Sequence, residues 1–359
     1  MHRDLAHSSL DAPARPAAPS FATWRSGGYA NLAVPRRADP VLLQQLGGRT
    51  MGTTWSLRFD NPRMLPLPQV RSAIDESLAR VIAQMSHWES ASDISRFNAA
   101  PAGSRHTIAR EFRDVLVCAL RWAEASGNAI DPTIGALVGC WAFGPDADES
   151  TAAFVPSAEA VAEARARTGW QGLAFDAATA TLLQPGGLAL DFSGIAKGFA
   201  VDHCVASLHA IGLHDLLMEI GGELRGAGRR PDGHPWQVMI DVPLSETVGT
   251  PQRVQLNDLA IATSGDRWHT RERDGRRWSH TIDPRSGEPV SNELAAVTVL
   301  HRSCMEADAL ATVLTVLGPV DGMAFAEKGD IAARFVCRGT DALDVRASSA
   351  WNSRDTLAQ

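Results

Sequence analysis

The stretch that decides the fold is Leu190-Asp191-Phe192-Ser193-Gly194-Ile195-Ala196-Lys197-Gly198-Phe199-Ala200-Val201-Asp202. An apolar strand ends at Asp191, the chain turns at Ser193-Gly194, and a helix begins near Ile195. The first turn of a helix carries unpaired N–H groups and the positive end of the helix dipole, and Lys197 adds a positive charge there. The stretch therefore predicts a site for an anion such as phosphate. The alternative is a structural turn with Lys197 on the solvated surface, because short glycine motifs recur by chance.

The composition of the chain argues against several classes of protein. The sequence has 359 residues and a formal net charge of -7, and its arginine-rich segments are short and interrupted by acids, which argues against a nucleic-acid partner. Roughly 18 consecutive apolar residues are needed to span a membrane, and we find no such run. The segment near residue 1 also lacks the apolar core of a secretory signal. We therefore expect a cytoplasmic protein without a membrane span.

The cysteines are also informative. They are odd in number, widely spaced and surrounded by apolar residues, and they include no CxxC pair. This pattern predicts buried thiols in a reducing compartment instead of a disulfide framework. The five are Cys118, Cys140, Cys204, Cys304 and Cys337.

The order of the expected elements predicts an α+β fold with mainly antiparallel sheets, built as two intimately packed α/β halves. Apolar residues at helical spacing predict helices over about residues 70–85, 112–123, 195–211 and 304–317. Alternating or β-branched runs predict strands over about residues 55–59, 216–220, 236–240, 260–265, 294–301, 331–336 and 343–347. We expect a disordered tail over residues 1–40, a folded domain over 41–350 and a C-terminal tail over 351–359.

Two residues in loops are candidates for ligand binding. Trp88 follows the first expected helix, at the start of a polar loop. Its ring either stacks on a planar ligand or packs into the core, as large aromatic side chains at helix ends often do. Asp131 precedes Pro132, which disfavours helical geometry, so we expect its carboxylate to project at a turn.

A third candidate site lies on the helix that the capping box Ser303-x-x-Glu306 begins. Asp308 and Thr312 lie one helical turn apart on it, so their oxygen atoms can converge. A pair of oxygen ligands suits Mg²⁺ far better than zinc. The alternative is a structural Asp308 that bonds a threonine hydroxyl or a neighbouring strand. His280 lies just before the turn that breaks another strand.

Six motifs occur in one order along residues 45–345, and together they resemble the FAD:protein FMN transferase (ApbE-like) family. The motifs are Met-Gly-Thr at 51–53, Ser-Asp-Ile-Ser-Arg-Phe-Asn at 92–98, Asp-Pro-Thr-Ile-Gly at 131–135, Leu-Asp-Phe-Ser-Gly-Ile-Ala-Lys-Gly at 190–198, His-Thr-Ile-Asp-Pro-Arg-Ser-Gly at 280–287 and Ala-Asp-Ala-Leu-Ala-Thr at 307–312.

The resemblance implies a set of site residues. At positions that contact FAD in the family, this chain has Met51, Trp88, Ala129, Ile130, Asp131, Asp191, Lys197 and Ile282. The family's Mg²⁺ is bound by a backbone carbonyl at the position of Gly194 and by side chains at the positions of Asp308 and Thr312. His280 matches the histidine that is thought to act as catalytic base. Some members have a further acid at the position of Ala311, whose methyl group here cannot bind a metal.

The resemblance also implies the reaction and its partners. A Ser or Thr hydroxyl of an acceptor flavoprotein attacks the FMN-side phosphorus of FAD, and AMP is released in a Mg²⁺-dependent step. The flavin is expected in the cleft between the two halves. Two alternatives stay open: a Mg²⁺-dependent FAD pyrophosphatase that yields FMN and AMP, and a flavin-binding protein without turnover.

Overall fold

The structure is a computed structural model that describes residues 43–144, 154–240, 252–265, 270–273, 276–339 and 343–356. The tail predicted for residues 1–40 lies outside the described residues. Residues 39–359 group into one compact unit, so the two expected halves are not separate domains.

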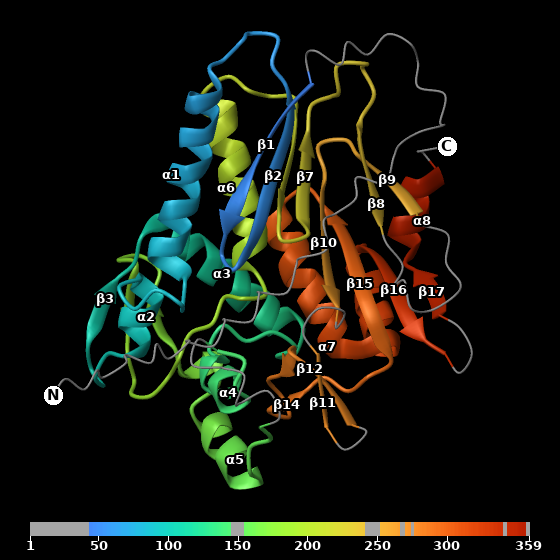
Figure 1. Ribbon diagram of the computed structural model, residues 1–359. Coiled ribbons are helices and arrows are strands. Elements are labelled where there is room, and N and C mark those ends of the chain that lie inside the picture. Colours follow the sequence, from blue (N-terminus) through green and yellow to red (C-terminus); the bar gives the residue numbers. More distant parts are fainter. Residues whose placement is uncertain are drawn as a thin grey trace, which may run out of the picture. The chain divides into compact units, whose positions relative to one another are not determined.

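The centre of the fold is an eight-stranded sheet (Figure 1). In spatial order it contains β1 (Leu43–Thr50), β2 (Thr53–Asp60), β6 (Leu216–Ile220), β7 (Glu223–Ala227), β10 (Ala260–Gly265), β15 (Leu294–His301), β16 (Ala332–Arg338) and β17 (Leu343–Ala347). Each strand pair in this sheet is antiparallel. The predicted α+β class with mainly antiparallel sheets is therefore confirmed.

The remaining elements surround this sheet. The helices are α1 (Leu67–Met85), α2 (Asp93–Asn98), α3 (Arg110–Ala125), α4 (Gly135–Cys140), α5 (Ala158–Ala166), α6 (Ala196–Ala210), α7 (Cys304–Lys328) and α8 (Ser349–Thr356). The smaller strands are β3 (Arg105–Thr107), β4 (Ala174–Asp176), β5 (Thr181–Leu183), β8 (Trp236–Ile240), β9 (Gln252–Leu256), β11 (Thr270–Arg273), β12 (Arg276–Ser279), β13 (Ile282–Asp283) and β14 (Glu288–Pro289).

The long helices form where apolar residues recur every three or four positions. In α1 the buried side chains Val70, Ile74, Leu78, Val81 and Met85 lie on one face, and Pro66 and Pro68 prevent an earlier start. The predicted helices near 70–85, 112–123, 195–211 and 304–317 are confirmed. Strand β1 was not predicted, because its burial is only partial and its apolar residues are few.

The central sheet is covered on both faces, as the alternation in β6 shows. Leu216 and Met218 belong to the large core under the helices, whereas Leu217 between them belongs to a second core. Successive side chains of a strand point to opposite faces, so β6 buries apolar residues on both faces, and Glu219 is its one polar side chain. The second core holds Trp236 from β8 and Trp351 from α8. Helices α6 and α7 therefore pack on one face, and the β8–β9 hairpin and α8 on the other.

Residues 351–356 are a correction to the prediction. We expected a C-terminal tail from residue 351, but Ser349–Thr356 form α8. Trp351 is only 1% exposed and packs in the second core beside Leu300 and Ala332. Ser348 Oγ also accepts a hydrogen bond from Ala333 N, which ties this end of the chain to β16. A single apolar residue in a polar segment has no periodicity, so the sequence pattern alone did not reveal the helix.

Helix α7 carries the predicted metal ligands. Ser303 Oγ accepts a hydrogen bond from Glu306 N, as the capping box predicts. Gly318 has non-helical dihedral angles and Pro319 follows it, so the straight part of the helix ends at Leu317, as predicted. By length and composition α7 is apolar enough to cross a membrane, but 56% of its apolar window is buried inside the protein. That is the behaviour of a core helix.

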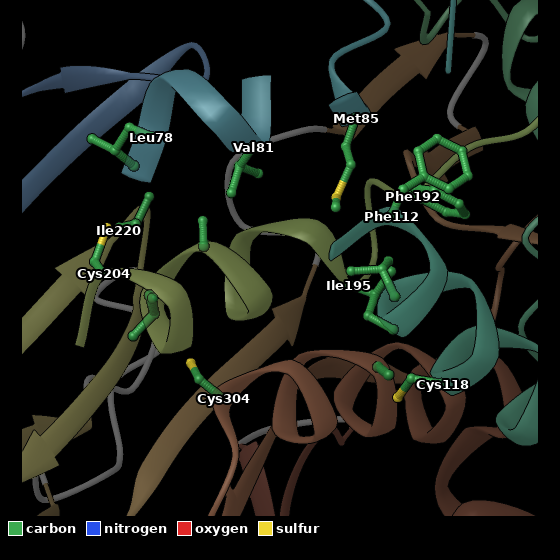
Figure 2. Close-up of a cluster of buried hydrophobic side chains, with 14 of the residues drawn as sticks. Leu78, Val81, Met85, Phe112, Cys118, Phe192, Ile195, Cys204, Ile220 and Cys304 are labelled. Carbon is green, nitrogen blue, oxygen red and sulfur yellow. The ribbon is translucent and has the colours of Figure 1, made fainter. Parts of the chain in front are cut away.

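Helix α6 lies between α1 and α7, and Figure 2 shows the core residues around it. Cys118, Cys204 and Cys304 lie in this core, and Cys337 is buried elsewhere. Burial raises the pKa of the thiols of Cys118 and Cys204 to about 12, so they stay protonated and unreactive. The prediction of buried thiols is confirmed for these four residues, whereas Cys140 is partly exposed.

The crossing of α6 and α7 requires a glycine at position 198. A Cβ atom there would lie 2.3 Å from Cys304 O and 2.7 Å from the Asp308 Cβ. We predict that Gly198→Ala lowers the free energy of unfolding by about 1–3 kcal/mol, because the two helices must separate. Gly139→Ala in α4 is the matched control, since an added Cβ there meets no atom within 4 Å. Urea unfolding of both variants measures the effect; equal stability would contradict it.

Candidate functional site

The motif at residues 190–198 and the motif at residues 131–135, which leads into α4, run side by side. Asp191 N donates to Pro132 O, and Gly135 N donates to Ala189 O, at 2.9 and 3.0 Å. Asn98 contacts the same region. Its side-chain amide donates a hydrogen bond to Leu190 O and accepts one from Leu190 N. Three of the six sequence motifs therefore meet at one place.

Asp131 holds this loop in its conformation. Its Oδ1 accepts hydrogen bonds from Thr133 N at 2.8 Å and Thr133 Oγ1 at 2.6 Å, and its Oδ2 accepts one from Trp170 N at 3.2 Å. Burial raises the pKa of Asp131, and these hydrogen bonds oppose the shift. The residue is non-helical, as predicted, but its carboxylate does not project: it is 2% exposed and faces inward.

The start of α6 differs from the prediction in one respect. We expected free N–H groups there for a phosphate, but Ala196 N donates to Phe192 O at 2.8 Å and Gly198 N donates to Asp308 Oδ2 at 2.9 Å. The anion that this helix end holds is therefore the carboxylate of Asp308. The positive end of the helix dipole stabilises that carboxylate in its ionised form.

Thr312 lies against Gly194, and Asp308, one helical turn earlier on α7, lies against Gly198. Thr312 Oγ1 lies 3.5 Å from Gly194 O. Gly194 has no room for a side chain, because a Cβ would lie 2.9 Å from Thr312 Oγ1. A carbonyl, a hydroxyl and a carboxylate fit a hard cation such as Mg²⁺. The described residues contain no group of three His, Cys, Asp or Glu that could hold a metal.

Lys197 lies between two buried carboxylates. Its Nζ is 2.6 Å from Glu223 Oε1, and Asp308 is the second acid that raises its pKa. Burial by itself lowers the pKa of Lys197, but the two acids raise it above its usual value, so the ammonium keeps its charge. About a third of the Lys197 side chain stays exposed, so a ligand or water can reach it.

The β1–β2 hairpin brings Met51 to the same region. Met51 and Gly52 form the turn, with φ of 47° and 70°, and Thr53 begins β2. β2 pairs with β6, so this turn lies next to the turn at Gly221-Gly222. A Cβ on Gly221 would lie 3.0 Å from Thr53 Cγ2 and 3.5 Å from Lys197 Cδ. The Met51-Gly52 turn therefore lies beside the Gly221-Gly222 turn, against which the stem of Lys197 packs.

Trp88 lies on the surface and not in the core. It is 65% exposed, so its ring is open to stacking on a planar ligand. The preceding residue, His87, points its Nε2 toward the opening motif, 3.3 Å from Ser193 Oγ and 3.6 Å from Asp191 Oδ1. Asp191 Oδ1 also accepts a hydrogen bond from Ser193 N. The end of α1 is thus held beside the turn that precedes Gly194.

His280 and Ile282 lie on a hairpin that reaches α7. His280 is half-buried in the bend between β12 and β13, and Ile282 is 5% exposed and packs with Leu137 and Trp141 of the α4 region. Arg285, in the turn that follows, donates to Val316 O at 3.3 Å. This contact places the hairpin against α7, about one turn beyond Thr312.

The other two predicted residues, Ala129 and Ile130, are buried at 0% and 8% exposure. A ligand at these positions would meet their backbone. Sequence analysis missed His87, Thr133 and Glu223, which contact predicted site residues. Glu223 follows the Gly221-Gly222 pair, a signal that pointed to a close approach of the backbone, but no pattern in the sequence links it to Lys197.

These features define a class of protein: an α+β fold in which a backbone carbonyl, a hydroxyl and a buried carboxylate lie along the contact of α7 with the start of α6, next to the Lys197–Glu223 ion pair. The ApbE family matches residues 51–335. The FAD:protein FMN transferase of Vibrio cholerae serotype O1 is 37% identical over 313 residues, which cover 87% of this chain and 92% of the relative. The protein of the same name from Haemophilus influenzae is 34% identical and is covered over 93% of its length.

Solved structures agree. The apo form of the flavinyl transferase ApbE from Pseudomonas stutzeri has a TM-score of 0.80 at 38% identity, and the match covers 87% of this chain and 96% of that one. The flavin transferase ApbE from Vibrio cholerae has a TM-score of 0.80 at 35% identity. The chain therefore belongs to the ApbE family, which confirms the resemblance seen in the sequence.

The hydrogen bonds around Asp131 yield a stability prediction. Thr133 Oγ1 donates to Asp131 Oδ1 and accepts from Gly169 N at 2.8 Å, and Thr133 is fully buried. Thr133→Val keeps the shape of the side chain but removes the hydrogen bonds with Asp131 Oδ1 and Gly169 N. We therefore expect the free energy of unfolding to fall by about 1–3 kcal/mol. Thr181→Val, at a surface strand, is the control. Urea unfolding with unchanged stability of Thr133→Val would refute this role for the hydroxyl.

Proposed function

We propose that this protein is an FAD:protein FMN transferase, which moves FMN from FAD to a Ser or Thr hydroxyl of an acceptor protein and releases AMP. The observation that carries the proposal is the site: Thr312 Oγ1 lies 3.5 Å from Gly194 O, and one turn earlier on α7 the Asp308 carboxylate accepts a hydrogen bond from Gly198 N and interacts electrostatically with Lys197. The names of relatives that match over most of their length support the same activity.

The donor set fits Mg²⁺, so we assign Gly194, Asp308 and Thr312 as its ligands. Bound there, the cation would supply charge neutralisation for the pyrophosphate of FAD. Burial raises the pKa of Asp308, but Lys197 and the hydrogen bond from Gly198 N oppose this shift and favour the ionised form. A divalent cation bound to this carboxylate would favour the ionised form as well.

We assign the flavin-binding residues from the family resemblance of the sequence and from the exposure of their side chains. The exposed ring of Trp88 is positioned to stack on the isoalloxazine, and Lys197 to pair with a phosphate. We assign Met51, Asp191 and Ile282 to the same ligand because they lie in three of the six motifs, and Asp191 shares its motif with Lys197. Ala129, Ile130 and Asp131 would contact the ligand through the backbone of their loop.

The chemical step needs a base for the acceptor hydroxyl, and we assign it to His280. The hydroxyl oxygen forms a bond to the FMN-side phosphorus, the bond from that phosphorus to the bridging oxygen breaks, AMP leaves, and His280 takes the proton. Asp283 is a poor substitute, because Arg285 occupies its carboxylate with hydrogen bonds from Nε and Nη2 at 2.9 and 2.8 Å. If water replaced the acceptor, the same residues would hydrolyse FAD to FMN and AMP.

The metal ligands are tested by substitution. We predict that Asp308→Ala abolishes Mg²⁺-dependent release of AMP from FAD, because the one anionic ligand is lost, and that Thr312→Val reduces it less. Thr315→Val is the control on the same helix, since its hydroxyl donates only to Ala311 O. AMP is measured over a Mg²⁺ titration, with and without an acceptor. Full activity of Asp308→Ala at low Mg²⁺ would rule out the metal site, and AMP without flavin on the acceptor would indicate a hydrolase.

His280 is tested by separating binding from chemistry. We predict that His280→Asn binds FAD almost normally but transfers flavin about 10²-fold more slowly or worse, because asparagine cannot accept the proton. FAD titration by fluorescence and the rate of acceptor flavinylation are measured on one preparation, with the melting temperature checked. His214→Asn, near the other end of α6, is the control. Near-normal transfer by a folded His280→Asn would remove His280 from the mechanism.

A further inference from the structure

Glu223 is a buried carboxylate with one partner. It is 2% exposed, and its Oε1 lies 2.6 Å from Lys197 Nζ. Within the described part of the chain, its Oε2 is buried without a hydrogen-bond partner. Buried carboxylates are normally satisfied at both oxygens, so this arrangement sacrifices stability at this point. Because the unpaired Oε2 lowers stability, we looked for a role of Glu223 at the site.

The surroundings show what Glu223 does to Lys197. Three acids lie near this lysine: Glu219, Glu223 and Asp308. Glu219 is bonded to Ser56 Oγ and Gly222 N, at 3.1 and 3.0 Å. Asp308 acts on Lys197 only through space, and in the described residues its carboxylate forms no ion pair with the ammonium. Among these three acids, Glu223 is therefore the one that forms an ion pair with the Lys197 ammonium.

The backbone places Glu223 for this contact. Gly221 and Gly222 have φ of 61° and 106°, which make the tight turn between β6 and β7, and Glu223 is the first residue of β7. The stem of Lys197 passes over Gly221, where a Cβ would lie 3.5 Å from Lys197 Cδ. The aliphatic stem of Lys197 therefore packs along this turn on its way to Glu223.

We propose that Glu223 is a positioning residue that holds Lys197 away from Asp308, so that the Asp308 carboxylate stays open to the divalent cation. The inference rests on the proposed function, because it concerns the same metal site. The ammonium and the cation compete for one carboxylate. When both acids are ionised, they and the lysine leave one negative charge for the cation; without Glu223, Lys197 and Asp308 neutralise each other.

The test measures metal binding directly. Mn²⁺, which binds oxygen ligands as Mg²⁺ does and is visible by electron paramagnetic resonance, is titrated into the full-length protein without FAD. We expect Glu223→Gln to bind Mn²⁺ about tenfold more weakly or worse, because the ammonium turns to Asp308. Glu219→Gln removes a nearby negative charge without freeing Lys197, and we expect it to change the affinity less than about twofold.

A double substitution separates competition by Lys197 from simple loss of charge. If the lysine is the competitor, Lys197→Met combined with Glu223→Gln binds Mn²⁺ as tightly as Lys197→Met alone. The same pair gives a second readout. Lys197→Met leaves Glu223 buried without its counter-charge and should lower the melting temperature, and adding Glu223→Gln should recover part of the loss.

The outcomes distinguish this inference from the proposed function. If the wild-type protein binds Mn²⁺ and Glu223→Gln binds it equally well, Glu223 does not guard Asp308 and the inference is overturned, while the metal site stands. If Glu223→Gln binds Mn²⁺ weakly and the added Lys197→Met substitution does not restore binding, the loss of the negative charge alone explains the weaker affinity. The inference then also fails. If the wild-type protein binds no Mn²⁺, the proposed metal site itself is wrong. Should Glu223→Gln not fold, Glu223→Asp retains the charge on a shorter side chain and should give a smaller loss in the same direction.

Discussion

The site depends on one hydrogen bond between two helices, from Gly198 N in α6 to Asp308 Oδ2 in α7. It exists because position 198 has no side chain, which lets α6 approach the backbone at Cys304. The contact places a buried carboxylate at the positive end of a helix and one turn from Thr312. The cation site, the pairing of Lys197 and the packing of the α6–α7 layer all follow from this crossing.

The charge of Lys197 acts on both buried acids near the crossing of α6 and α7. Burial raises the pKa of Asp308 and raises that of Glu223 to about 7, and in both cases the Lys197 ammonium opposes the shift. A single lysine thus serves two carboxylates, one as a close partner and one at a distance. Two acids and one lysine therefore share this region, and the close pair is Lys197 with Glu223.

The rest of the fold brings distant segments to this place. The antiparallel pairing of β2 with β6 sets the Met51 turn beside Gly221, and Asn98 joins the end of α2 to Leu190. The hairpin with His280 is fixed to α7 through Arg285. Each segment is a loop or turn at the end of a rigid element, which is where binding residues are commonly found.

Local pattern was sufficient for the main helices, the antiparallel α+β class and the residues of the six motifs, because periodicity and turn chemistry act over a few residues. The sequence also placed Asp308 and Thr312 on one helix face. It did not reveal α8, where one buried tryptophan replaces a periodic pattern, nor the inward orientation of Asp131. The bond between Gly198 and Asp308 joins residues 110 positions apart, and the Lys197–Glu223 pair depends on two separate elements. Which partner a charged side chain takes is decided by packing across the core, and no local pattern encodes that choice.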